Sequence, residues 1–215
     1  MNKTYAVFGM GRYGSAVAKE LVRNGAEVLA VDSNESIVNS LIGEIPYCKC
    51  ADVTDAEVIK QLGIANMDVV IVAMASSLES SVMTVMLCKE AGVPKVIVKC
   101  ASETHRKIFE KIGADKVLLP EVESGARMAK NLLTDGFIDA VELSGEISLL
   151  EFDVKKEWIG KSLAELNLRK KYMLNVVAIR KDGGLDVSID PTMVLQEGME
   201  LIVIMHTSQI GKLKK

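Results

Sequence analysis

The sequence predicts an α/β protein in which a Rossmann-like, doubly wound parallel sheet is followed by a small α+β domain. Three observations lead to this prediction. Short apolar runs alternate with helix-spaced patterns from residue 5 to residue 119, which is typical of a parallel sheet covered by helices. The first run leads into a Gly-x-Gly-x-x-Gly loop at residues 9–14. Beyond residue 137 the apolar runs follow one another without long helices between them.

The loop at residues 9–14 has the residues of a phosphate-binding turn between a strand and a helix. Gly9 permits the tight turn, Gly11 lets backbone N–H groups approach a phosphate, and Gly14 lets the helix pack close to the strand. The helix then begins with free N–H donors. Asp32 ends the next apolar run about twenty residues on, where the motif needs an acid for ribose hydroxyls. These signals predict a dinucleotide-binding unit.

The later strands and helices are marked by residues typical of their ends. Residues 33–36 would cap the second helix, and Thr54-Asp55-Ala56-Glu57 has the capping-box pattern, which makes Thr54 the expected cap of the third. Six strands are the full doubly wound set, and their expected order is 3-2-1-4-5-6. The strands expected here span residues 5–8, 28–32, 47–51, 69–73, 95–99 and 116–119, and the helices after the first five end near residues 25, 42, 63, 90 and 113.

Polar and charged residues follow several of these expected strands. Ligands of doubly wound sheets bind beyond the carboxyl ends of the strands, so residues at those ends are candidate ligand contacts. The candidates are Arg12, Asp32, Asp52, Thr54, Met74, Lys99 and Glu121, with Tyr13 inside the glycine loop.

The pattern changes after residue 122. Residues 124–133 are expected to form a connecting helix, and the strands expected beyond it span residues 140–143, 147–154, 175–180, 186–189 and 200–205. Ser162-Leu163-Ala164-Glu165 has a second capping box and predicts one short helix, and Asp182-Gly183-Gly184 predicts a turn between strands. We therefore predict a nucleotide-binding domain at 1–122, a connecting crossover helix at 123–136 and a C-terminal domain at 137–215.

The composition restricts the classes of function. Half of the chain is apolar (49%) but only 4% is aromatic, and the net charge is −3, from 26 basic and 29 acidic residues. This charge argues against a nucleic-acid polymer as partner and against direct attraction to an anionic membrane. The four cysteines lack the spacing of a zinc site and predict a reduced, cytoplasmic protein, with Cys48 and Cys50 as a less favoured redox pair. Neither a signal peptide nor an apolar run of about 20 residues is expected, so any membrane association would need a partner.

The motifs together resemble the RCK (regulator of conductance of potassium) family. The first part of the likeness is carried by the loop at 9–14, by Ala51-Asp52-Val53-Thr54, and by residues 111–115 leading to Pro120-Glu121. The second part is carried by residues 159–166 and 175–180, which look like the companion C-terminal RCK domain. The order of the motifs is similar to that in cytosolic regulatory subunits of Ktr-type potassium uptake systems. Met173 departs from the pattern, because relatives often carry a glycine there.

The resemblance implies a function and roles for individual residues. Such subunits form homodimers that assemble into an octameric ring on a membrane-embedded potassium channel or transporter, bind ATP or ADP, and gate potassium flux from the cytoplasmic face of the membrane. Asp32 would hold the ribose, and Arg12 the terminal phosphate. Gly9, Gly11 and Gly14 would hold the phosphates, and Glu121 would lie near the triphosphate beside Mg²⁺ or Ca²⁺. Arg169 and Pro191 are the candidates for a cyclic di-AMP site at the C-terminal domain.

Other interpretations of the same residues are open. The protein could be an NAD(H)-binding oxidoreductase or an NAD(H)-responsive regulator, since the glycine loop and Asp32 suit NAD or NADH equally. An oxidoreductase would need a substrate domain with a general acid or base, which residues 137–215 do not suggest. Arg12 could be a solvated residue at a helix start, and Glu121 could only favour the start of the following helix. We predict a regulator and not an enzyme.

Overall fold

The protein is described from a computed structural model, which covers residues 3–74, 77–133 and 139–213. Contacts divide the chain into two units, Met1–Glu121 and Val122–Lys215. The limits of the connecting segment at 123–136 remain a prediction. Among the described helices, none is both long and apolar enough to cross a membrane.

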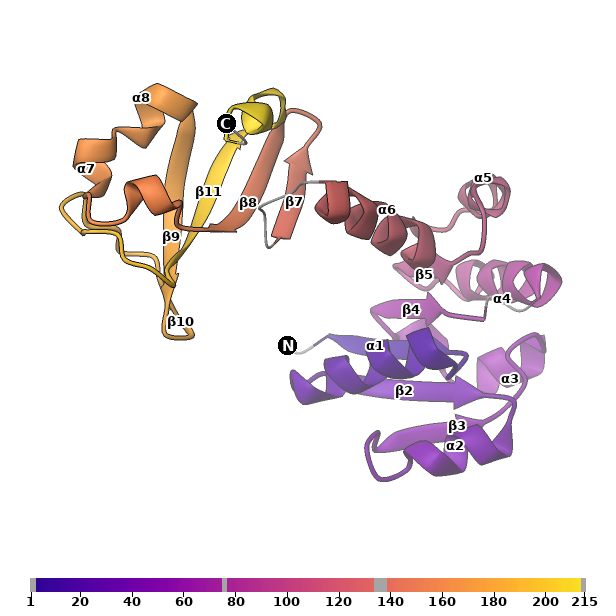
Figure 1. Ribbon diagram of the computed structural model, residues 1–215. Helices are drawn as coiled ribbons and strands as arrows, with labels where there is room; N and C mark the ends of the chain where they lie inside the picture. The colour runs from indigo at the N-terminus through magenta and orange to yellow at the C-terminus, as the bar shows by residue number, and fades with distance from the viewer. Residues whose placement is uncertain (1–2, 75–76, 134–138, 214–215) are drawn as a thin grey trace. The chain divides into compact units, whose positions relative to one another are not determined.

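The described residues of the first unit form a six-stranded parallel sheet with the order β3-β2-β1-β4-β5-β6 (Figure 1). This order confirms the predicted doubly wound fold. It places the carboxyl ends of β1 and β4 next to each other, where the direction of winding changes. The strands are β1 (Thr4–Phe8), β2 (Glu27–Asp32), β3 (Tyr47–Cys50), β4 (Val69–Val72), β5 (Val96–Lys99) and β6 (Lys116–Leu118).

Each face of this sheet packs against its own helices. Successive residues of a strand point to opposite faces, so Val7 and Phe8 of β1 belong to different cores. α1 and α2 cover the face that carries Val7, and α3, α4 and α5 cover the face that carries Phe8. These helices are α1 (Arg12–Arg23), α2 (Glu35–Leu41), α3 (Ala56–Gln61), α4 (Leu78–Glu90) and α5 (Glu103–Lys111), with a 3-10 turn η1 (Ile64–Asn66) before β4.

Two helix starts differ from the sequence prediction. The cap of α3 is Asp55, whose carboxylate accepts a hydrogen bond from the Glu57 N–H, so the prediction of Thr54 as cap was wrong. Thr54 bonds to Asp52 instead. α6 (Pro120–Leu133) begins at Pro120 and not at residue 124, because proline lacks an N–H and has a fixed φ that suits the first helical position. Glu121 therefore lies in the first turn of α6.

The described residues of the second unit form a five-stranded sheet with the order β10-β9-β11-β8-β7, in which paired strands are antiparallel. This confirms the predicted α+β class. One face packs on a core that includes Leu150, Leu174 and Leu201, together with Trp158 of the 3-10 turn η2. The elements are β7 (Asp139–Ser144), β8 (Ile147–Asp153), η2 (Lys156–Trp158), α7 (Leu163–Leu166), α8 (Leu168–Tyr172), β9 (Leu174–Lys181), β10 (Gly184–Asp186), β11 (Glu200–His206) and η3 (Thr207–Lys212).

The second unit differs from the prediction at a strand and a helix. Asp182 and Gly183 have φ angles of 50° and 77° and form a two-residue hairpin turn, so that Gly184 pairs with Lys181. The partner strand is therefore Gly184–Asp186, and the strand predicted at 186–189 was wrong. The capping box of α7 is present, with Ser162 and Glu165 bonded reciprocally. α8 was not predicted, because it is a second helical turn that starts directly after Asn167.

Met173 ends α8 in the left-handed conformation, with φ 56°. A glycine, which the resemblance leads us to expect there, would adopt this backbone geometry more easily, because a Cβ atom makes it unfavourable. The side chain of Met173 is 58% exposed, so its removal costs little packing.

We predict that Met173→Gly stabilises the protein by about 0.5–1 kcal/mol, because it relieves the left-handed strain. Denaturant unfolding monitored by circular dichroism measures this change. Met128→Gly is the matched control, since Met128 is 65% exposed inside α6, where glycine costs about 1 kcal/mol. A loss of stability in both variants would contradict the strain at Met173.

Candidate functional site

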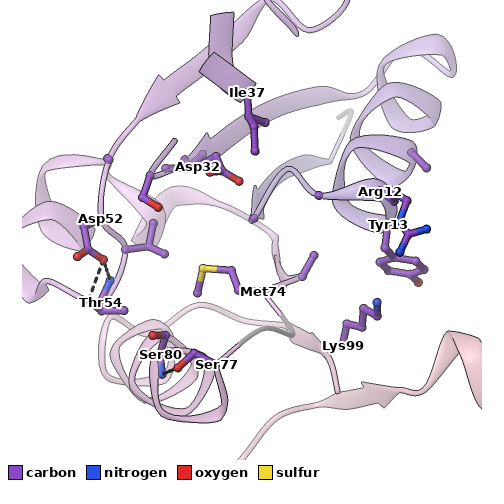
Figure 2. A pocket seen from close by; sticks show the side chains of 18 of the residues that line it. Arg12, Tyr13, Asp32, Ile37, Asp52, Thr54, Met74, Ser77, Ser80 and Lys99 are labelled. Carbon is purple, nitrogen blue, oxygen red and sulfur yellow. Dashed lines mark hydrogen bonds between the residues drawn. The ribbon is translucent and has the colours of Figure 1, made fainter. Parts of the chain in front are cut away.

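A cleft of about 950 Å³ opens at the carboxyl ends of the strands of the first unit (Figure 2). It lies where the doubly wound topology predicts a ligand. Gly14 does not line it, although it was predicted as a contact. The predicted residues that do line the cleft are Gly9, Gly11, Arg12, Tyr13, Asp32, Asp52, Thr54, Met74, Lys99 and Glu121.

The glycines shape the floor of the cleft in different ways. Gly9 has a φ of 88° and donates its N–H to the Val31 carbonyl at 2.8 Å. Gly14 packs behind Gly9, and a Cβ atom on Gly14 would overlap the Gly9 carbonyl oxygen. Gly11 has open space where a Cβ would project. Gly14 therefore lets α1 approach the strand ends, whereas Gly11 leaves the backbone accessible from the cleft.

Asp32 connects the glycine loop to the end of β2. Its Oδ2 accepts a hydrogen bond from the Met10 N–H at 2.6 Å, and its Oδ1 accepts one from the Asn34 N–H at 2.8 Å. The carboxylate is thus fixed in place, and each oxygen keeps a further lone pair. A carboxylate held in this way at the rim of a cleft can accept hydrogen bonds from a diol.

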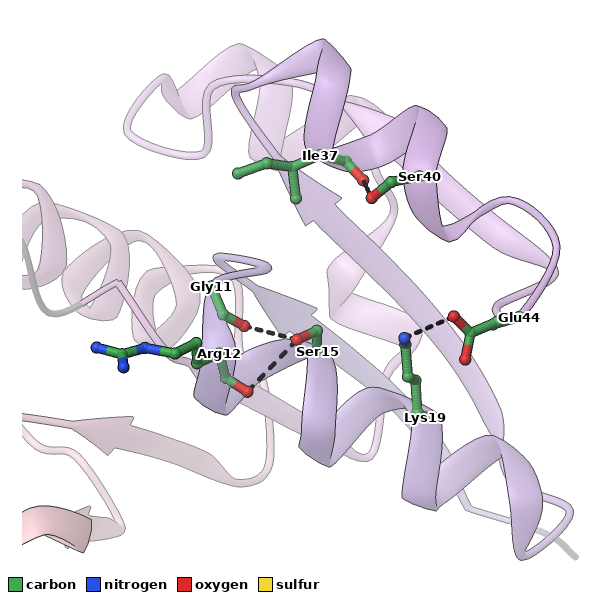
Figure 3. Close-up of polar contacts among 7 residues, drawn as sticks. All are labelled: Gly11, Arg12, Ser15, Lys19, Ile37, Ser40 and Glu44. Carbon is green, nitrogen blue, oxygen red and sulfur yellow. Dashed lines mark hydrogen bonds and ion pairs between the residues drawn. The ribbon is translucent and has the colours of Figure 1, made fainter.

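The start of α1 offers backbone donors and an exposed cation. Gly11 is its cap and provides no side-chain hydrogen bond, so the first N–H groups of the helix are available to an anion. The Ser15 hydroxyl donates to the Gly11 carbonyl at 2.8 Å, and Lys19 forms an ion pair with Glu44 at 2.6 Å (Figure 3). The side chain of Arg12 points away from these contacts (Figure 3) and is exposed at the cleft.

The wall opposite the glycine loop is formed by the loop after β3 and the start of α4. The Asp52 carboxylate accepts hydrogen bonds from the Thr54 N–H at 2.9 Å and from its hydroxyl at 2.7 Å. These bonds lower the pKa of Asp52. Further lining residues were missed by the sequence analysis, although a serine-rich turn before α4 could have indicated some of them. They are Ala16, Val31, Ser33, Ile37, Ala51, Val53, Ala73, Ser77 and Ser80.

Lys99 and Glu121 form an ion pair at the edge of the cleft. The Lys99 ammonium lies 2.6 Å from Glu121 Oε1 and 5.5 Å from the centre of the Tyr13 ring. The hydrogen bond from Lys99 lowers the pKa of Glu121, and the positive charge of Arg12 acts in the same direction. Glu121 thus carries a negative charge that this chain already neutralises.

The ion pair disfavours the divalent cation that was expected beside Glu121. Mg²⁺ and Ca²⁺ need several oxygen ligands, yet the described residues contain no cluster of three or more His, Cys, Asp or Glu that could hold a metal. A cation at Glu121 would also meet the ammonium of Lys99. The side chains described for one chain therefore do not fit a resident metal ion.

The cleft combines the groups that a nucleotide needs. Backbone N–H groups, Arg12 and Lys99 lie on the side of the glycine loop, where they suit phosphates. Asp32 suits ribose hydroxyls, and Ile37 and Met74 offer apolar surface beside it (Figure 2). Arg169 and Pro191 line a separate pocket of about 250 Å³ in the second unit, together with Asn167 and Asn175.

The fold and the cleft define a class of protein. A doubly wound sheet with this glycine turn, followed by an antiparallel sheet with short helices, is the arrangement of RCK domains. The chain is similar over 99% of its length to the crystal structure of the GsuK RCK domain, with a TM-score of 0.54 and 23% identity, and it covers 46% of that chain.

The sequence comparisons define the family. The TrkA-N domain model matches residues 5–120, and the TrkA-C domain model matches residues 149–215. Two Bacillus subtilis proteins are similar over nearly the whole chain. Ktr system potassium uptake protein C is 37% identical, covering 100% of this chain and 97% of the relative, and Ktr system potassium uptake protein A is 36% identical, covering 98% and 95%. The chain therefore belongs to the TrkA-N/TrkA-C family that includes the Ktr potassium uptake proteins.

We predict that Gly14→Ala destabilises the protein by about 1–3 kcal/mol, because the added methyl group must displace α1 from the Gly9 carbonyl. Urea unfolding monitored by circular dichroism tests this. The control is Gly125→Ala in α6, where a Cβ meets no atom within 4 Å and alanine favours the helix by about 0.5–1 kcal/mol. Equal stability of Gly14→Ala and the unmodified protein would show that α1 has room to move.

Proposed function

We propose that this protein is a cytoplasmic, nucleotide-sensing regulatory subunit of a potassium uptake system, and that ATP and ADP bind in the cleft of the first unit. The main support is the arrangement around Asp32, whose carboxylate is fixed by the Met10 and Asn34 N–H groups. It faces the same cleft as the glycine turn and the cations Arg12 and Lys99. The cleft thus contains an acceptor for ribose hydroxyls and donors for phosphates.

The phosphate side of the cleft favours a nucleotide with a terminal phosphate over NAD(H). Arg12 presents a planar, permanently charged guanidinium, which suits a terminal phosphate with several free oxygens. NAD and NADH have an internal pyrophosphate and would engage Asp32 but make less use of Arg12. An NAD(H)-responsive regulator is the second candidate, because Asp32 serves either ligand. We assign no catalysis to the protein, since the similar Ktr relatives are named as uptake proteins.

Mg²⁺ or Ca²⁺ enters this proposal only as a companion of bound ATP. The Glu121 carboxylate is occupied by Lys99, and a triphosphate would have to supply most of the oxygen ligands.

The proposed assembly follows the relatives. Because Ktr relatives are matched over nearly their full length, we propose that this chain also acts with a membrane-embedded potassium channel or transporter subunit, at the cytoplasmic face of the membrane. Homodimers assembling into an octameric ring would let nucleotide binding change the shape of the assembly, through its different affinity for two states. Cyclic di-AMP at Arg169 and Pro191 remains a proposal for the second unit.

We predict that Arg12→Ala weakens ATP binding about tenfold or more and weakens ADP and NADH binding much less, because the lost hydrogen bonds are charge-assisted. Isothermal titration calorimetry of the full chain with ATP, ADP, NAD and NADH, each with and without Mg²⁺, measures this. Arg23→Ala is the matched control, since Arg23 is an exposed arginine in the last turn of the same helix.

The outcomes of this titration separate the candidates. The proposed sensor is supported if ATP or ADP binds more tightly than NAD and NADH, and if this preference is reduced in Arg12→Ala but not in Arg23→Ala. Equal loss of all four ligands would contradict the role of Arg12, and binding of NADH alone would favour the second candidate. A strictly monomeric protein in light scattering at micromolar concentration would contradict the ring.

A further inference from the structure

The ion pair between Lys99 and Glu121 joins a fixed cation to a movable anion. The Lys99 side chain is 14% exposed, whereas that of Glu121 is 69% exposed. Lys99 is the last residue of β5, in the interior of the sheet, and Glu121 is the second residue of α6. The ammonium therefore has little freedom, while the carboxylate can turn into water.

We propose that Lys99 distinguishes a nucleoside triphosphate from a diphosphate by exchanging Glu121 for the terminal phosphate. This inference rests on the proposed function, because it requires an adenine nucleotide in the cleft. It adds that the counter-ion of Glu121 is a residue of the chain itself, and that triphosphate binding breaks an existing ion pair at the start of α6.

The position of the ammonium favours contact with a ligand. Lys99 lines the same cleft as Gly11 and Arg12, and the Tyr13 ring at 5.5 Å supports its charge from one side. An ammonium has three donors, and within the described part of the chain Glu121 is the carboxylate found within ion-pair distance of it. A phosphate beside Arg12 would thus find in Lys99 a second, less exposed cation.

The exchange is favoured by the difference in charge between the two anions. A carboxylate carries one negative charge, and a terminal phosphate carries nearly two and has three acceptor oxygens. The pair with Glu121 contributes little, because the Glu121 side chain is exposed and water screens its charge. Charge-assisted bonds to phosphate at a less exposed ammonium are stronger. A diphosphate that ends short of Lys99 leaves the ion pair intact.

The released carboxylate remains at the start of α6. The backbone N–H of Glu121 itself contributes to the lowered pKa of this side chain, and a negative charge is stabilised at a helix N-terminus. Glu121 is also the last residue of the first unit. The presence of a third phosphate would therefore change how firmly the first turn of α6 is tied to β5.

Calorimetry of the full chain in EDTA tests this proposal without divalent cations. Lys99→Gln should weaken ATP binding about tenfold and ADP binding less than about threefold. Glu121→Gln should tighten ATP binding several-fold, because it removes the competing anion. This gain in ATP affinity should vanish in the double variant that combines Lys99→Gln with Glu121→Gln, because the gain depends on the freed Lys99 ammonium. Lys95→Gln is the matched control, because Lys95 is exposed just before β5, at its opposite end.

Hydrogen exchange of residues 120–133 gives a second measurement that does not require Lys99→Gln to fold. In the unmodified protein residues 123–126, whose N–H groups begin the hydrogen-bond ladder of α6, should exchange faster with ATP than with ADP, and in Glu121→Gln the two rates should be equal. Equal losses of ATP and ADP affinity in Lys99→Gln, persistence of the Glu121→Gln gain in the double variant, or identical exchange with both nucleotides would each overturn the inference. Failure of the unmodified protein to bind either nucleotide would instead refute the proposed function.

Discussion

The close approach of α1 to the ends of β1 and β4 is the constraint on which the cleft depends. It requires that Gly14 have no side chain, because the Gly9 carbonyl occupies that space. Once α1 is seated there, its uncapped N–H groups lie at the floor of the cleft, and the Met10 N–H reaches Asp32. Because Gly14 has no side chain, the start of α1, which would bind phosphates, and Asp32, which would bind the ribose, can both take their places in the proposed site.

The sequence predicted the fold of the first unit well, since its signals are local and agree with one another. Each apolar run of strand length is followed by a helix with a recognisable end, and the doubly wound order follows from that alternation. The same rule, which needs no side-chain geometry, predicted many of the cleft residues at the strand ends, but it missed others there, such as Ser33, Ala51 and Ala73. Gly14 was predicted to let the helix pack close to the strand, and the structure confirms this. The resemblance also assigned it to the phosphates, but Gly14 does not line the cleft.

The errors came from places where two local signals compete. At residues 54–57 both Thr54 and Asp55 could cap a helix, and Asp52 decided between them by binding the Thr54 hydroxyl. At residues 182–186 two adjacent glycines made it uncertain which residues form the turn and which residue begins the next strand. Gly184 belongs to the strand, since it pairs with Lys181. The ion pair of Lys99 with Glu121 could not be predicted, because it joins positions 22 residues apart in sequence through the packing of β5 beside β6. Sequence patterns report such neighbours only after the topology is known.

The rigid carboxylate of Asp32 also determines what the cleft would refuse. Both of its oxygens are engaged by backbone N–H groups, so it cannot swing aside for a negatively charged substituent on the ribose. A nucleotide with a 2′-phosphate would bring like charges together at this point, and no cation lies among the neighbours of Asp32 that line the cleft in the described structure, Val31 and Ser33. Under the proposed function, NADP and NADPH, which carry that phosphate, would therefore be excluded from the cleft, whereas ATP, ADP and NAD(H), which lack it, would not.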